Sequence, residues 1–405
     1  MSFESYFEKV LEVAKAIQLP ILSSDEWEQV GLLEKCLNCG ICTMFCPVMQ
    51  IPSVETYHGP RSISTETSRH FTQFRLMFDE VMKCTLCGEC REVCPQNVPV
   101  TNIIKLVRGK ILEYVPSILP SSIAKYVESL KETGLFTPPM NREEREEMYE
   151  FLDVPVVPDR YKRQADVVYF PGCQALSTLI EIVEATKTIL EKLDVNYTLL
   201  ESWSCCGYPA HILGMNELAE ELVNRLIDKI NEKKAKIILT TCAGCTANLK
   251  RVLEGYDTNI SVKHLIEYLI EDIKPVKLIE IMREPHLKEK ITVTIHYPCE
   301  LNRHVGKYMN DYLHNLVESL PNVKFVESKK GEKCCGGGGI LLLYDSKLSL
   351  EIAKLKAKDF KLSGSSIVLT ACPSCITNIN RGIAEIGERN LRAKDISAFI
   401  AKNLK

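Results

Sequence analysis

The eighteen cysteines of this 405-residue chain limit its possible structures more than any other feature, because they fall into four groups with none left over. Two groups of four lie near the N-terminus, and two groups of five follow. The groups are Cys36, Cys39, Cys42 and Cys46; Cys84, Cys87, Cys90 and Cys94; Cys173, Cys205, Cys206, Cys242 and Cys245; and Cys299, Cys334, Cys335, Cys372 and Cys375. Cysteines scattered through a fold would leave strays. The arrangement therefore predicts a chain that carries iron–sulfur clusters.

The composition is typical of a soluble globular protein, with 45% hydrophobic and 25% charged residues. The net charge of −3 and the lack of a long basic run predict no nucleic-acid partner. The segment from Met1 to Lys15 lacks the order of a secretory signal, and no apolar stretch approaches the roughly 18 residues of a membrane span. We therefore expect a cytoplasmic protein with reduced thiols, peripheral to a membrane only through a partner.

From about residue 166 the sequence repeats itself, which indicates one module used twice. Each module alternates short β-branched strands with amphipathic helices, a pattern that predicts a parallel sheet with right-handed crossovers. The expected strands are 166–171, 195–200 and 237–241, then 292–297, 323–327 and 366–371; the expected helices are 176–193, 216–233, 308–319 and 346–361.

The cysteines of each module follow these strands. In the first module, Cys173 follows the first strand, the adjacent pair follows the second, and Cys242 with Cys245 follows the third. The second module has the same order. Because parallel strands bring their carboxyl ends to one edge of the sheet, we expect the five thiols of each module to gather in one crevice.

Both N-terminal groups have the spacing Cys-x2-Cys-x2-Cys-x3-Cys-Pro, and Gly40 and Gly88 allow the backbone to approach a cluster closely. This spacing resembles that of two-cluster ferredoxins, and zinc is less fitting because zinc ribbons usually use two separated pairs. The resemblance implies two cubane 4Fe–4S clusters with crossed ligands. One would be bound by Cys36, Cys39, Cys42 and Cys94, and the other by Cys84, Cys87, Cys90 and Cys46.

The five-cysteine groups exceed the four ligands that a cubane needs, and an adjacent pair favours a bridging or distorted cluster. Both groups resemble the CCG-domain family and, more narrowly, the catalytic subunits of heterodisulfide reductase in their membrane-associated, fused form. That resemblance implies one or two non-cubane 4Fe–4S clusters. The first five-cysteine group, which begins at Cys173, would bind one such cluster as a cofactor. The second group would be catalytic; its members are Cys299, Cys334, Cys335, Cys372 and Cys375. Zinc in one module is the alternative.

Histidines and glycines near the second group are further candidates. His304 is the expected proton donor to a departing thiolate, and His296 is a second candidate. For each histidine the more common role is that of a polar loop residue or a residue beside the cluster. Related sequences often have histidine where this chain has Glu300. The run Gly336–Gly339 would let a substrate approach the backbone, or would form a tight turn.

We expect an N-terminal α-helical ferredoxin-like domain followed by two α/β modules, an α+β or α/β fold. The expected boundaries are 1–110 for the ferredoxin-like domain, 111–165 for a partly helical connector, 166–285 for the first CCG module and 286–405 for the second.

The resemblance implies an oxidoreductase that reduces a small disulfide, such as the mixed disulfide of coenzymes M and B, to two thiols. Electrons would come from an electron-donor or acceptor subunit, a flavoprotein or a membrane cytochrome or quinone-linked subunit. The alternative is an electron-transfer subunit of a glycerol-3-phosphate or glycolate dehydrogenase, which passes electrons from flavin to quinone. The chain itself lacks a Gly-x-Gly-x-x-Gly turn for a dinucleotide, so a partner is expected either way.

Overall fold

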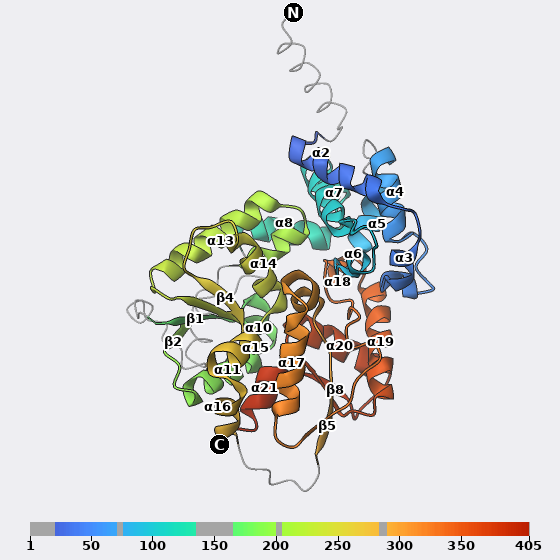
Figure 1. Ribbon diagram of the computed structural model, residues 1–405. Helices are drawn as coiled ribbons and strands as arrows, with labels where there is room; N and C mark the ends of the chain where they lie inside the picture. Colours follow the sequence, from blue (N-terminus) through green and yellow to red (C-terminus); the bar gives the residue numbers. More distant parts are fainter. Residues whose placement is uncertain (1–20, 71–75, 135–164, 200–204, 283–289, 405) are drawn as a thin grey trace, which may run out of the picture. The chain divides into compact units, whose positions relative to one another are not determined.

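The computed structural model describes residues 21–70, 76–134, 165–199, 205–282 and 290–404 (Figure 1). The chain divides into two compact units. The first unit contains Met1–Lys125 and two short segments from later in the chain, His211–Met215 and Gly336–Ile352. The second unit contains the remaining residues and includes both duplicated modules.

The described secondary structure of the N-terminal region is helical. Its elements are α2 (Ser24–Gly31), η1 (Leu32–Lys35), α3 (Ile41–Phe45), η2 (Val48–Gln50), α4 (Pro60–His70), α5 (Phe78–Lys83), α6 (Glu89–Glu92), α7 (Val100–Tyr114), η4 (Pro116–Ile118) and α8 (Ser121–Thr133). The last three cover the described part of the predicted connector, and its residues 135–164 lie outside the described residues.

The two four-cysteine motifs follow the same backbone path. Asn38 (φ 56°) and Gly40 (φ 80°) are left-handed in the first motif, as are Leu86 (φ 55°) and Gly88 (φ 75°) in the second. Each glycine is followed directly by a short helix, α3 or α6. Since glycine adopts the left-handed conformation without a Cβ clash, it allows the chain to turn back around its own cysteines.

Arg108 on α7 fixes the start of the second motif. Its side chain is 1% exposed. The guanidinium donates to the carbonyl of Val81 at 2.6 Å and to that of Cys84 at 2.8 Å. A further nitrogen donates to the carbonyl of Ile212, in one of the short segments of the same unit, at 2.8 Å. A buried charge requires such acceptors, so this contact holds three separate segments of the first unit together.

The first module is a four-stranded parallel sheet with the strand order β2-β1-β3-β4. Its elements are β1 (Val167–Phe170), α10 (Cys173–Thr178), α11 (Ile180–Lys192), β2 (Tyr197–Leu199), α12 (Tyr208–Ile212), α13 (Asn216–Asn231), β3 (Ile237–Thr240), α14 (Ala243–Leu253), β4 (Ser261–His264), α15 (Leu265–Tyr268), η5 (Leu269–Ile273) and α16 (Pro275–Glu280).

The second module repeats this plan with the order β6-β5-β7-β8. Its elements are β5 (Ile291–Ile295), η6 (Glu300–Val305), α17 (Tyr308–Ser319), β6 (Val323–Phe325), α18 (Leu341–Tyr344), α19 (Ser346–Leu362), β7 (Ile367–Thr370), α20 (Pro373–Glu385), β8 (Arg392–Asp395) and α21 (Ile396–Ala401). The predicted fold class and parallel sheets are confirmed, but each module has a fourth strand, β4 or β8, that the sequence analysis missed.

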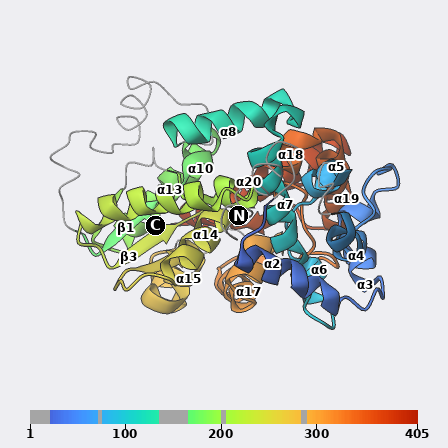
Figure 2. The ribbon, with the colours of Figure 1, turned by 90° about the horizontal axis from the view of Figure 1, so that it is seen from above.

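Side chains alternate across the first sheet and build two cores. Val168 and Phe170 of β1 pack with residues of α13 and α14, and α13 lies along the sheet in both views (Figures 1 and 2). Val167 and Tyr169 belong to the other core, which includes residues of α11 and continues into the second module, where it includes Val293 of β5. The red helix α21 accordingly lies beside α11 (Figure 1). The two modules therefore share one apolar core.

Within the described residues, no helix combines the length and the apolar character needed to cross a bilayer.

His264, which ends β4, makes folding stability sensitive to acid. Its ring is buried and accepts a hydrogen bond from the N–H of Ile266 at 3.2 Å, which caps α15. Burial lowers the pKa of His264 to about 3. The unfolded chain binds a proton below about pH 6.5 and the folded chain does not, so the free energy of unfolding should fall by about 2 kcal/mol between pH 6.5 and pH 5.

A His264→Asn variant retains a capping acceptor. We expect its unfolding free energy, measured anaerobically in urea, to decline less between about pH 7 and pH 5 than that of the parent chain. An equally steep decline in both proteins would contradict this prediction.

Candidate iron–sulfur centres

The eight N-terminal cysteines line two pockets in the first unit. One pocket is lined by Cys36, Cys39, Cys42 and Cys94, and the other by Cys46, Cys84, Cys87 and Cys90. Cys90 also reaches the first pocket. The structure thus gathers the thiols in the crossed sets that the ferredoxin resemblance implies, with the last cysteine of each motif beside the first three of the other.

The chemistry of these pockets fits a bound cationic group. Burial and then the charges of Cys87 and Cys84 raise the pKa of Cys46. The pKa of Cys90 is raised by the same causes, burial first. The backbone N–H of Leu86 donates to the sulfur of Cys84 at 3.3 Å. Buried thiols that oppose one another's ionisation become good ligands once a metal supplies positive charge, so the donor sets suit 4Fe–4S clusters.

In the first module, hydrogen bonds join four of the five thiols in sequence. They link Cys205 with Cys206, Cys206 with Cys245, and Cys245 with Cys242. The bonds from Cys205 and Cys245 hold the pKa of Cys206 well below its usual range. Burial and then the charge of Cys206 raise the pKa of Cys173 to about 12. The five cysteines delivered by three strands therefore meet in one place.

The second module brings Cys335, Cys372 and Cys375 together in the same way. All five cysteines are buried. The sulfur atoms of Cys335 and Cys375 are 3.5 Å apart, and Cys375 is also hydrogen-bonded to Cys372. Cys334 adjoins Cys335 in the chain, and Cys299 lies at the start of η6.

The two five-cysteine sets are in contact with each other. Hydrogen bonds from Cys245 and then from Cys372 lower the pKa of Cys242 to about 5. The contact with Cys242 is also the largest cause that raises the pKa of Cys372 to about 11. A thiol of the first module therefore touches a thiol of the second, and the two cysteine sets adjoin each other.

Residues next to the cysteines connect the modules on both sides of this contact. Gln174, which follows Cys173, accepts a hydrogen bond from Ser374 at 2.6 Å. Glu300, which follows Cys299, accepts one from the hydroxyl of Tyr208 at 2.8 Å. In each module the residue after the first cysteine thus reaches the other cysteine set, which fixes the separation of the two sets.

A duplicated asparagine–arginine pair positions the adjacent cysteines, and the sequence analysis missed it. The amide of Asn248 donates to the carbonyl of Cys206 at 2.6 Å, and Arg251 donates to Asn248 at 2.9 Å. In the second module, Asn378 donates to the carbonyl of Cys335 at 2.7 Å and accepts from Arg381 at 2.8 Å. The signal was available, because both modules read Cys-x2-Cys-x2-Asn-x2-Arg.

Replacing Asn378 with leucine should destabilise the second module, because the buried carbonyl of Cys335 would lose its donor. An unsatisfied buried acceptor costs about 1–3 kcal/mol. Anaerobic denaturant unfolding and iron content should both decrease relative to the parent chain. Asn390→Leu, at an exposed position, is the control and should change the unfolding free energy by less than about 0.5 kcal/mol. Equal effects of the two substitutions would contradict the positioning role.

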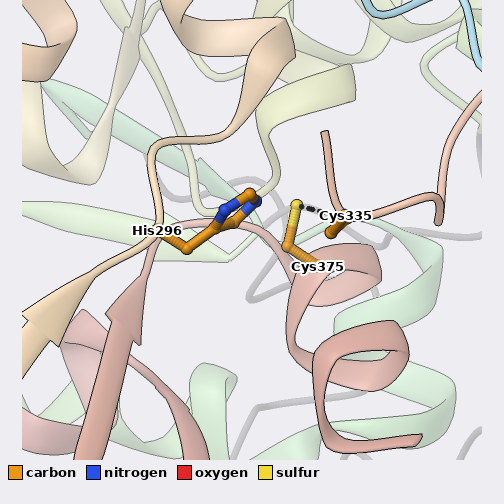
Figure 3. Close-up of side chains that lie close together, drawn as sticks. All are labelled: His296, Cys335 and Cys375. Carbon is orange, nitrogen blue, oxygen red and sulfur yellow. Dashed lines mark hydrogen bonds between the residues drawn. The ribbon is translucent and has the colours of Figure 1, made fainter. Parts of the chain in front are cut away.

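The two candidate histidines occupy different environments. His304 lies on η6 and is exposed. His296 is 1% exposed and directly follows β5, and its ring points toward the thiol of Cys375 (Figure 3). Burial and then the charge of Lys356 hold the pKa of His296 well below its usual range. The exposed His304 remains an expected proton donor, whereas His296 belongs to the buried sulfur cluster.

The run of glycines after Cys335 lies against the chain's own backbone. At Gly339, an added Cβ would lie 2.4 Å from the carbonyl carbon of Thr85 and 2.5 Å from the carbonyl oxygen of Cys84. All of these residues belong to the first unit. The close approach that the glycines allow is therefore made, at Gly339, by the second ferredoxin-like motif.

Comparisons with known families agree with this architecture. Residues 32–98 match the 4Fe-4S dicluster domain, and residues 167–250 and 293–380 match the cysteine-rich domain named CCG. These matches include all eighteen cysteines, and the donor sets described above fit iron–sulfur clusters.

Several relatives align over most of the chain. A dihydromethanophenazine:CoB–CoM heterodisulfide reductase subunit of Methanosarcina mazei is 29% identical, with 93% of this chain and 95% of the relative covered. The corresponding subunit of Methanosarcina barkeri is 27% identical with the same coverage. The glycolate oxidase iron–sulfur subunit of Escherichia coli is 23% identical over 87% of this chain and 91% of its own length.

Among solved structures, a hypothetical protein from Helicobacter pylori superposes with a TM-score of 0.59 at 12% identity. The match covers 100% of this chain and 76% of the other. At this identity the likeness concerns the fold alone.

Proposed function

Because the chain joins a 4Fe-4S dicluster domain to two CCG domains and is related to iron–sulfur subunits of heterodisulfide reductase, we propose that it is the disulfide-reducing iron–sulfur subunit of an electron-transfer complex. The observation that carries the proposal is the contact between the thiols of Cys242 and Cys372. A relay needs a single path for electrons. Two adjoining cysteine sets that each hold a cluster would instead offer one iron-bearing site to each sulfur atom of a disulfide.

The proposed reaction takes RS–SR′, two electrons and two protons to RSH and R′SH. The two ferredoxin-like sites would deliver electrons singly, and the clusters held by the five-cysteine sets would supply iron that binds the cleaved thiolates. Cys299, Cys334, Cys335, Cys372 and Cys375 would hold one such group, and the first-module set the other. His304, which is exposed, would pass a proton from solvent. Thiol–disulfide chemistry is a two-electron couple, so cleavage between two one-electron sites divides it into feasible steps.

The relatives' names support the substrate class and the need for partners. The Methanosarcina relatives are named for the CoB–CoM heterodisulfide and for dihydromethanophenazine. We propose a low-molecular-weight disulfide of this kind as substrate, and a flavoprotein or a membrane cytochrome or quinone-linked subunit as the electron partner. The proposed location is the cytoplasm, peripheral at a membrane through that partner.

A relay without substrate chemistry is the second candidate. The observation that favours it is the similarity to the glycolate oxidase iron–sulfur subunit over 87% of this chain. Under this alternative, electrons would pass from a separate flavin subunit to quinone, and the two five-cysteine sets would need no access for a thiol.

Anaerobic metal analysis and EPR separate these candidates. Four 4Fe–4S groups predict about 16 iron ions per chain, and two predict about 8. If the proposal holds, the oxidised protein will contain about 16 iron ions and develop a new paramagnetic signal when coenzyme M or coenzyme B is added. Full iron content without any response to thiols would favour the relay. About 8 iron ions with one zinc ion per module would leave the proposed chemistry without a site.

A further inference from the structure

The two five-cysteine sets differ at one buried position beside the sulfur atoms. Three residues before its first cysteine, the second module has His296, and the first module has Phe170. Both side chains are at most 1% exposed. The backbone explains the correspondence, because the N–H of His296 donates to the carbonyl of Leu369 at 2.9 Å, and Phe170 pairs with Thr240 in the first sheet. The modules therefore place an imidazole and a phenyl ring at equivalent points.

The imidazole of His296 lies within metal-binding reach of two thiols. One ring nitrogen and the sulfur atoms of Cys335 and Cys375 all lie within 4.8 Å of one another. The two sulfur atoms are 3.5 Å apart (Figure 3). Two sulfurs bound at about 2.3 Å to one tetrahedral ion are separated by about 3.8 Å. The two sulfur atoms are therefore already within a few tenths of an ångström of the separation that one ion requires, and the ring nitrogen needs a shift of at most about 1 Å to join them.

Among the described residues, the ring has no partner that would explain its burial. Neither nitrogen of His296 makes a hydrogen bond of normal geometry with them, although the carbonyl of Gly331 lies near the ring. The edge of the ring instead meets Phe360, with ring centres 6.2 Å apart. Burying an unpaired polar group is costly, so a nitrogen held in a sulfur-lined site calls for a ligand.

We propose that His296 is a sixth ligand of the second five-cysteine set and binds the same metal ion as Cys335 and Cys375. The inference rests on the proposed function, since it concerns the group that this set would hold. Ligand identity is one of the means by which a protein tunes an iron–sulfur centre. His296 would give the iron of the second module one more electron-pair donor than the first module offers, since the first module has phenylalanine at the equivalent position.

Pulsed EPR of the full chain, purified anaerobically with natural or 15N-labelled histidine, tests the proposal. The thiol-responsive signal of the parent chain should show a strong coupling to nitrogen that changes with the label. His296→Phe, which installs the first module's residue, should lose that coupling. His314→Phe, on α17, is the matched control and should keep the coupling.

Labelling the parent chain decides the question even if His296→Phe fails to retain iron. A thiol-responsive signal without nitrogen coupling in the parent chain would overturn this inference and leave the proposed function standing. Nitrogen coupling in a reduced protein that never responds to thiols would support His296 as a ligand. It would contradict the proposed disulfide reduction.

Discussion

Cys242→Ser and Cys372→Ser variants should each lose disulfide reduction by at least about a hundredfold, although the two residues belong to different modules. The reason is the direct contact of their thiols, through which Cys372 helps to lower the pKa of Cys242. If the substrate disulfide is divided between the two cysteine sets, damage to either set removes one of the two sites that receive a cleaved thiolate. Thiol release, measured anaerobically with a reduced viologen dye as donor, reports the loss.

The double variant provides the sharper measurement. Residues that act as a unit have strongly non-additive effects, so Cys242→Ser combined with Cys372→Ser should be no slower than the worse single variant. Reduction of the ferredoxin-like sites of the first unit by the same dye is the internal control and should be unchanged. Turnover near the parent value in Cys242→Ser would mean that the second module cleaves the disulfide alone.

The positions of the cysteines in the sequence predicted that the five thiols of each module converge at one edge of its sheet. They follow three successive strands in each module, and parallel strands end at one edge, so the five thiols of a module had to converge. The strands were found because they are short β-branched and aromatic runs such as Val167–Phe170. The helix 308–319 was predicted with the bounds that α17 has.

The fourth strands were missed because their sequences resemble loops. β4 reads Ser-Val-Lys-His and β8 reads Arg-Ala-Lys-Asp, and each buries only alternate residues. Both strands are at the edge of their sheet, where one side faces no neighbouring strand and polar side chains are tolerated. Four residues with a single apolar member carry too little signal for a strand to be recognised without its neighbour.

The contact between the two modules depends on long-range packing that spacing cannot express. The hydrogen bonds of Ser374 with Gln174 and of Tyr208 with Glu300 join residues 200 and 92 positions apart. Nothing in the sequence indicates that the two sulfur sets face each other. The same is true of His296, whose sequence position is near Cys299 but whose ring lies beside Cys335 and Cys375.

The glycine run is the clearest case of a feature that was noticed in the sequence and explained only by the structure. Because glycines have no side chain, the run was compatible with either a substrate site or a tight turn. In the first unit, the segment that it begins is anchored by Tyr344, whose hydroxyl donates to Asp79 at 2.6 Å and whose ring meets Phe78 edge-on. Gly339 lies at the tightest point, against the carbonyl of Cys84 that Arg108 also binds.

Gly339→Ala should therefore damage the second ferredoxin-like site far more than Gly387→Ala, although both glycines have a left-handed backbone. Gly339 has φ +65° and Gly387 has φ +68°, but a Cβ at Gly387 would meet nothing within 4 Å. The left-handed conformation alone costs an alanine about 1–2 kcal/mol. At Gly339, overpacking against backbone that cannot rotate away adds about 1–3 kcal/mol.

We expect Gly387→Ala to lose only the smaller amount of unfolding free energy and to keep its full complement of iron. Gly339→Ala should lose about twice as much, and it should release iron from the pocket that Cys84 lines, because the backbone at Cys84 and Thr85 must move to admit the methyl group. Iron analysis and anaerobic unfolding of the two variants side by side measure the difference. If both variants keep the same iron content and the same stability, the glycine is not required by its contact with the cysteine motif.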